Sequence, residues 1–160
     1  MHTSFRFNGN QAHLQLFLIR VYIGLDFIHH FAEKFGWLGM QDKLDVLHYF
    51  QALGYHDSLF MMGLAGLCEF GAFVGFTFGL CTRLAAIGTA LYLVITLFSG
   101  NHHHFGFTWV NPGGGWEFPA LWAFLCLSFV LTGGGRWSVD AVIHKYLPLT
   151  APTLLKRLFA

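Results

Sequence analysis

The stretch LQLFLIRVYIGLDFIHHFAEKF, from Leu14 to Phe35, is long enough to cross a lipid bilayer, yet it contains the charged residues Arg20 and Asp26. An ionised group without a partner in such a helix costs at least about 2.5 kcal/mol on insertion scales. Only 11% of the chain is charged, and 55% is hydrophobic. The few polar groups inside apolar stretches are therefore the best sequence evidence for function.

Four apolar stretches predict membrane spans of roughly 20 residues each. They are Leu14–Phe35, Ser58–Leu80, Leu84–Gly100 and Phe118–Gly133. The third is short, and a tilted or partly re-entrant helix is one interpretation of the fourth. A mean hydropathy of +0.54 and 19 Phe and 19 Gly among 160 residues are typical of helical membrane proteins. We therefore expect an all-α integral membrane protein, with residues 1–160 forming one domain built on a four-helix bundle.

The connection between the first two spans has the pattern of a short amphipathic helix. From Asp42 to Gln51, Leu44, Leu47 and Phe50 repeat at three-residue spacing among charged residues and a histidine. This pattern predicts a short helix that lies on the membrane surface after the first span.

The basic residues are distributed unequally between the two sides that these spans define. The terminal arms and the connection between the second and third spans contain Arg6, Arg83, Arg136, Lys145, Lys156 and Arg157. The other two connections hold only Lys34 and Lys43. The positive-inside rule then places both termini in the cytoplasm of a multi-pass protein in a bacterial-type inner membrane. With a net charge of +1 and no basic run, no nucleic-acid partner is expected.

Polar residues of the first span gather on one side of the predicted helix. At 100° per residue, six of them fall within about half of the circumference. They are Arg20, Asp26, His29, His30, Glu33 and Lys34. Asp26 precedes His29 by three residues and His30 by four, so its carboxylate can hydrogen-bond either imidazole. A seam that only fixes helix packing and a functional site are both open interpretations.

The second span contains one carboxylate and a ridge of small residues. Glu69 lies near its middle, and we expect it to form a buried pair with Arg20, since such a pair lets both charges be tolerated. Gly71, Gly75 and Gly79 repeat at four-residue spacing and predict close packing of another helix.

The segment Asn101–Glu117 concentrates histidines and tryptophans at the predicted outer surface. His102, His103 and His104 are consecutive, so at most two of them can serve one centre. Together with Glu117 and either His29 or His30, they define one hypothesis, a nitrogen and oxygen site for zinc, copper or iron. Interfacial or hydrogen-bonding histidines are the alternative interpretation.

Several short motifs follow one another in a characteristic order. They are Arg20-x-x-x-Gly24, His29-His30, Lys34, Gly54, Glu69-x-Gly71, Gly79-x-x-Thr82-Arg83-x-Ala85-Ala86, Gly114-Gly115-x-Glu117 and Gly135-Arg136-x-Ser138-x-Asp140. This ordered set resembles the DoxX family of small membrane proteins, from about Leu16 to Asp140. The resemblance implies a four-helix membrane protein related to the small subunit of thiosulfate:quinone oxidoreductase. One departure is His29-His30, where a His-Gly pair is common in the family.

The leading functional hypothesis is a membrane subunit of a redox system, with a quinone pocket in the outer half of the bundle. His30 and Glu117 are the predicted proton-transferring groups, because quinone reduction takes up protons with electrons. The expected ring-binding residues are Arg20, Glu69, His29 and His103, with Arg20 and Glu69 as a polar floor. We expect His30, His103 and Glu117 to converge on this pocket and a soluble or membrane redox protein to supply the electrons.

Two alternatives come from other functional classes. In the first, His102, His104, the neighbouring histidines and Glu117 bind a metal ion at the outer face, in a non-catalytic or transport module. In the second, the glycine ridge docks partner proteins or another copy of the chain.

The predicted topology is tested by thiol labelling. We expect a cysteine introduced by Lys43→Cys to react with a membrane-impermeant thiol reagent added outside intact cells, and one introduced by Arg157→Cys to remain unlabelled. The reverse pattern would overturn the orientation and the outer placement of the histidines.

Overall fold

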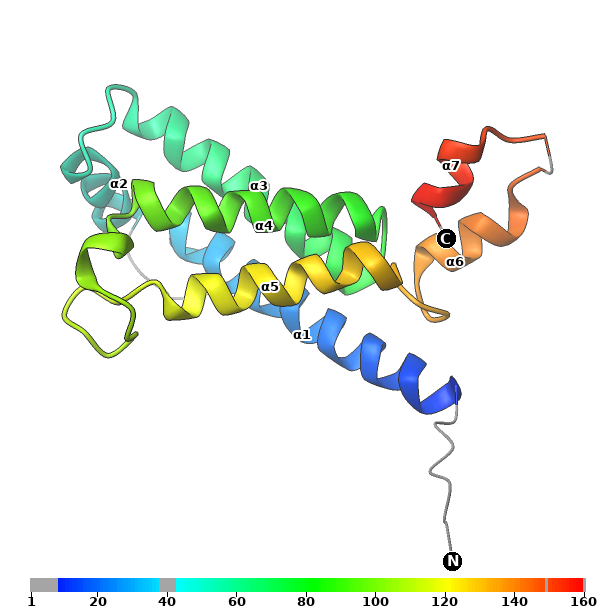
Figure 1. The fold of residues 1–160 in the computed structure, drawn as a ribbon. Helices are drawn as coiled ribbons and strands as arrows, with labels where there is room; N and C mark the ends of the chain where they lie inside the picture. Colours follow the sequence, from blue (N-terminus) through cyan, green and yellow to red (C-terminus); the bar gives the residue numbers. More distant parts are fainter. Residues whose placement is uncertain (1–8, 38–42, 149, 160) are drawn as a thin grey trace, which may run out of the picture.

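The computed structural model describes residues 9–37, 43–148 and 150–159, and in these residues the secondary structure is helical (Figure 1). The elements in chain order are α1 (Gly9–Lys34), α2 (Lys43–Ala52), α3 (Ser58–Phe78), α4 (Thr82–Ser99), the short 3-10 helix η2 (His102–Phe105), α5 (Glu117–Thr132), α6 (Val139–Tyr146) and α7 (Thr153–Leu158). The prediction of an all-α membrane protein is confirmed.

The four predicted spans correspond to α1, α3, α4 and α5. Among the described residues, α1, α3 and α4 are long and apolar enough to cross a membrane, whereas α5 is a shorter apolar helix of 16 residues. The helix predicted between the first two spans is present as α2, and Asp42 of that prediction lies outside the described residues. Leu67, Phe124 and Leu131 are 66%, 72% and 83% exposed, as side chains that contact lipid must be.

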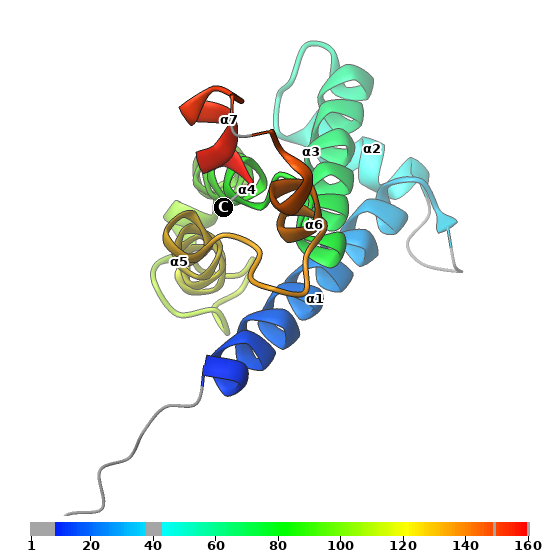
Figure 2. The same ribbon diagram turned by 90° about the vertical axis from the view of Figure 1, so that its right-hand side faces the viewer.

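The long helices pack side by side, with α1 along α3, and α4 between α3 and α5. Figure 2 looks along α4 and α5 and shows α1 crossing them obliquely. Their shared core includes Ile23, Phe27, Phe76, Trp122 and Phe129. The helices α2 and η2 lie at one end of this bundle, and α6 and α7 lie at the other (Figure 1).

Glycines allow close contact at two of the helix packing sites. A Cβ at Gly24 would overlap Thr77, and a Cβ at Gly75 would overlap Ala85, so α1 and α4 each approach α3 at a glycine. The predicted close packing is therefore confirmed at Gly75, whereas Gly71 is exposed and a Cβ there would meet nothing within 4 Å.

Arg20 is fully buried and binds the carboxyl end of α3. Its Nη1 donates to the carbonyl oxygens of Phe76 and Thr77, the latter at 3.0 Å, and its Nη2 donates to the carbonyl of Trp137 at 2.7 Å. The last carbonyls of a helix have no partner within it and carry partial negative charge. A guanidinium at this position therefore satisfies them and compensates that charge.

Asp140 binds backbone N–H groups at the start of α4, as Arg20 binds carbonyls at the end of α3. Its Oδ1 accepts from the Cys81 N–H at 2.6 Å, and its Oδ2 accepts from the Thr82 N–H at 2.8 Å. Its own N–H donates to the Gly79 carbonyl at 2.9 Å. Asp140 is 2% exposed, and its carboxylate satisfies the free N–H groups at a helix N-terminus. The turn between α3 and α4 is thus fixed by one buried cation and one buried anion.

The predicted pair of Arg20 with Glu69 is wrong, and so is the polar floor that it defined. Arg20 lies level with Phe76 and Thr77, which follow Glu69 by about two helical turns, or roughly 10 Å. Because α1 and α3 run antiparallel, Glu69 is reached instead from the far end of α1, by Lys34.

A double-mutant cycle tests the role of Arg20. Arg20→Ala is expected to lower the free energy of unfolding by roughly 3 kcal/mol, because it removes charged hydrogen bonds from buried carbonyls. Its effect should be non-additive with Asp140→Ala, which acts on the same turn, and additive with Glu69→Ala within about 0.5 kcal/mol. Denaturant titration in detergent measures these energies, and stronger coupling to Glu69 than to Asp140 would contradict the assignment.

Candidate functional site

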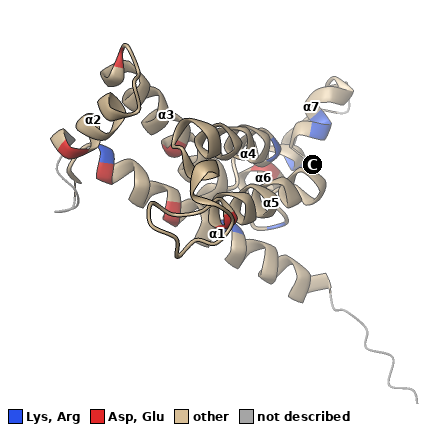
Figure 3. Ribbon diagram, turned by 60° about the vertical axis from the view of Figure 1, so that its left-hand side comes forward, with Lys and Arg blue, Asp and Glu red and all other residues tan. Residues whose placement is uncertain are grey.

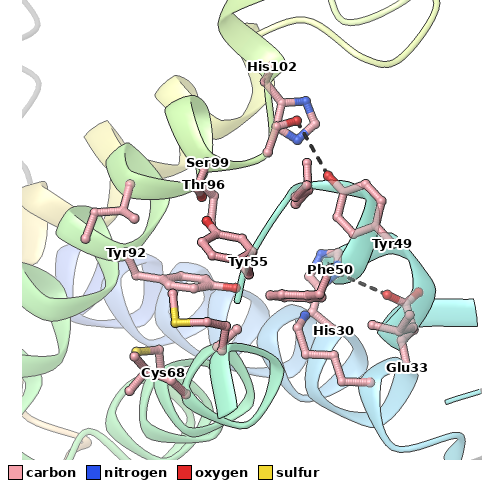
Figure 4. Close-up of a pocket in the computed structure, with 18 of the residues that line it drawn as sticks. His30, Glu33, Tyr49, Phe50, Tyr55, Cys68, Tyr92, Thr96, Ser99 and His102 are labelled. Atoms are coloured by element: carbon pink, nitrogen blue, oxygen red, sulfur yellow. Dashed lines mark hydrogen bonds and ion pairs between the residues drawn. The ribbon is translucent and has the colours of Figure 1, made fainter. Parts of the chain in front are cut away.

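A cavity of about 630 Å³ lies at the α2 end of the bundle (Figure 4). Its walls come from α1, α2, α3, α4 and η2. The lining residues are His30, Glu33, Lys34, Asp45, Val46, Tyr49, Phe50, Leu53, Tyr55, Met61, Leu64, Ala65, Cys68, Gly88, Leu91, Tyr92, Ile95, Thr96, Ser99, Gly100 and His102. Most of these side chains are apolar or aromatic, as is usual for small-molecule sites.

The cavity exists because α3 and α4 diverge. They touch where Gly75 meets Ala85 and separate toward the other end of the bundle, as Figure 1 shows. There α2 forms the remaining wall, with Val46 buried and the Tyr49 hydroxyl donating to the Gly100 carbonyl at 3.5 Å. Burial, and secondarily the neighbouring Tyr55, raises the pKa of Tyr49 above its ordinary value.

A charged network lies at the inner side of the cavity. Lys34 Nζ donates to Glu69 Oε1 at 2.6 Å, and the Tyr92 hydroxyl donates to the same oxygen at 2.7 Å. Glu69 is 3% exposed, and its Oε2 has no hydrogen-bond partner among the described residues. Lys34 and Tyr92 line the cavity, whereas Glu69 does not. The buried carboxylate therefore influences the cavity by holding these two side chains in place.

A second group of charges follows α1 at the rim. His30 Nδ1 lies 3.4 Å from Glu33 Oε2, and His30 Nε2 lies 3.7 Å from Asp26 Oδ2, the contact expected from their spacing. His29 Nε2 lies 3.4 Å from Glu33 Oε1. Figure 3 shows these acidic positions along α1, away from the basic residues of α7. His30 and Glu33 line the cavity, and His29 and Asp26 do not.

The segment Asn101–Glu117 is held mainly by its own contacts. His102 Nδ1 lies 3.2 Å from the Gly114 carbonyl oxygen, and His103 Nδ1 lies 3.2 Å from that of Leu97. The His103 and His104 rings are 3.9 Å apart. Glu117 Oε2 accepts from the backbone N–H of Trp109 at 3.0 Å, so this carboxylate closes the loop that precedes α5.

The structure divides the residues predicted as one site. Of His30, His103 and Glu117, only His30 lines the cavity, and His102 joins it there from η2. Among the described residues, no group of three or more His, Cys, Asp or Glu side chains could hold a metal ion, so the metal hypothesis gains no geometric support.

Sequence reasoning did not select Tyr92, and it assigned Lys34 only to the polar seam. A signal for Tyr92 was present, since it is the one ionisable side chain between Leu84 and Gly100. Tyr49 and Tyr55 carried no comparable signal, because tyrosines are common at membrane interfaces.

These features define a class, a multi-pass all-α membrane protein with a polar network beside an apolar cavity. The sequence model of the DoxX family matches residues 15–102, more than half of the chain, and the chain belongs to the DoxX family. All residues that line the cavity fall within the matched segment. The motifs at Glu117 and at Arg136–Asp140 lie beyond it. No curated protein and no solved structure matches the chain significantly.

The network can be tested by removing its charges separately and together. Lys34→Met should lower the free energy of unfolding by about 3–5 kcal/mol, because it leaves the Glu69 carboxylate buried without its cation. Adding Glu69→Leu should restore part of the loss, since no unpaired charge then remains. Denaturation in detergent measures both variants, with the exposed Lys145→Met as a control expected to change stability by less than about 0.5 kcal/mol. If the effects of Lys34→Met and Glu69→Leu on the free energy of unfolding were additive, the Lys34–Glu69 ion pair would be excluded.

Proposed function

We propose that this protein is the membrane subunit of a redox system and that its cavity binds a quinone. The observation that carries the proposal is the junction of an apolar cavity with the Lys34–Glu69–Tyr92 network inside a membrane bundle. Membership of the DoxX family supports a membrane protein with a link to redox chemistry.

The size and position of the cavity suit a lipophilic ring. Its volume of about 630 Å³ falls within the range of small-molecule pockets. Leu64, Leu91 and Ile95 line it and are 44%, 58% and 62% exposed, so this wall reaches the surface where lipid would lie. A ligand dissolved in the bilayer could therefore enter between α3 and α4 without passing through water.

The polar groups match the needs of quinone reduction. The ring accepts two electrons and two protons, and each carbonyl oxygen becomes a hydroxyl. Lys34 has three N–H donors, and Glu69 is the one side chain that binds it among the described residues, which leaves donors for a ring oxygen. His30 and Glu33, at the rim, would pass protons inward, since imidazole and carboxylate groups can act as general acids and bases. The electrons would come from a redox protein bound to the membrane surface.

The proposal also assigns an orientation. With both termini in the cytoplasm of an inner membrane, the α2 and η2 end faces outward, and so does the rim that contains His30.

Two neighbouring histidines provide a matched test. His30 lines the cavity and His29 does not, although both contact Glu33 and their side chains are 49% and 57% exposed. His30→Ala should weaken quinone binding by roughly threefold to tenfold, the effect of one hydrogen bond. His29→Ala should change it by less than about twofold.

The purified protein in lipid nanodiscs is titrated with a quinone, and binding is measured as quenching of tryptophan fluorescence. Trp122, 8% exposed, packs against the core near Tyr22 and reports whether the bundle stays folded. Equal effects of the two substitutions, or no binding by the unmodified protein, would contradict the proposal.

A further inference from the structure

We infer that the ligand carries a long isoprenoid-type hydrocarbon tail, and that this tail lies in a groove between α3 and α4. The inference rests on the proposed function and narrows its substrate class. It distinguishes a lipid-resident quinone from a short, water-soluble one.

The groove is a second hollow, of about 460 Å³, lined by residues of α3, of α4 and of the turn between them. It is lined by Cys68, Phe70, Gly71, Ala72, Val74, Gly75, Leu80, Cys81, Ala85, Gly88 and Thr89. No charged side chain lines it. A hydrocarbon chain is the ligand chemistry that such a surface accepts without leaving a buried polar group unpaired.

The groove adjoins the cavity. Cys68 of α3 and Gly88 of α4 line both hollows, one from each helix. Figure 4 shows Cys68 beside Tyr92, at the edge of the cavity. A ring held near Lys34 and Tyr92 would therefore extend a substituent between Cys68 and Gly88 into the groove.

Two glycines keep the groove open without being needed for helix packing. Gly71 and Gly88 are exposed, and a Cβ at either would meet nothing within 4 Å. Gly75 differs, because a Cβ there would overlap Ala85. A glycine inside a helix costs roughly 0.5–1 kcal/mol relative to alanine. A tail in the groove would occupy the space beside Gly71 and Gly88.

The groove contributes shape rather than hydrophobic driving force, since lipid is as apolar as its walls. It runs from Cys68 to beyond Gly75, which is roughly 10 Å along α3. A tail attached to a ring in the cavity must leave by some route. A side chain that fills the groove would prevent a tailed quinone from placing its ring in the cavity, whereas binding of a tailless quinone would be unaffected.

The test compares two quinones with the same ring, one with a tail of several isoprene units and one with no tail, in nanodiscs. Gly71→Leu is the decisive variant, because Gly71 lines only the groove. It should weaken binding of the tailed quinone by about tenfold, as overpacking of an occupied site does, and change binding of the tailless one by less than about twofold. Gly63→Leu is the matched control, since Gly63 lies on α3, is exposed, has nothing within 4 Å and lines neither hollow.

A second measurement does not depend on a substitution. A tailed quinone with a photoreactive diazirine on its tail should label the peptide that contains Val74 and Leu80. Labelling confined to lipid or to helices other than α3 and α4, or equal weakening of both quinones by Gly71→Leu, would overturn the inference while leaving the proposed function in place. Absence of binding for both quinones in the unmodified protein would instead remove the proposed function, and the inference with it.

Discussion

The buried guanidinium of Arg20 is the constraint on which the rest of the bundle depends. At 0% exposure it has no water, so its charge must be met by protein groups. The carbonyls of Phe76 and Thr77 and that of Trp137 provide this, and they belong to two segments far apart in sequence. Their binding fixes how far α1 slides along α3 and where the chain returns after α5.

The close packing of α3 and α4 at their shared turn accounts for their separation at the other end of the bundle. Arg20 and Asp140 hold the α3–α4 turn tightly, and Gly75 lets the two helices touch beside it. Straight helices that meet at one end and cross at an angle must separate at the other. The cavity is therefore a consequence of the packing at the turn, and the Lys34–Glu69–Tyr92 network supplies the polar contacts that its inner wall would otherwise lack.

Much of the fold could be predicted from hydrophobic patterning, including the long helices and α2, because length and periodicity are local properties. The partners of Arg20 could not be predicted. Backbone carbonyls have no sequence signature, and the register between antiparallel helices is not encoded in either helix alone. The same limit applies to the site. His30 is found by its charge pattern, whereas the cavity depends on helix divergence, so Tyr92 was missed and Glu69 was paired with the wrong cation.

The Asp140 contact also affects when the bundle can finish packing during synthesis. Asp140 lies 59 residues after Cys81, whose N–H it accepts, and a ribosome synthesises the chain from its N-terminus. While α1, α3 and α4 enter the membrane, the start of α4 has no carboxylate, and the Trp137 carbonyl that binds Arg20 has not yet been made. The segment 15–102, by which the family is recognised, contains the whole cavity but lacks both of these groups. Its final packing must therefore wait until translation passes residue 140.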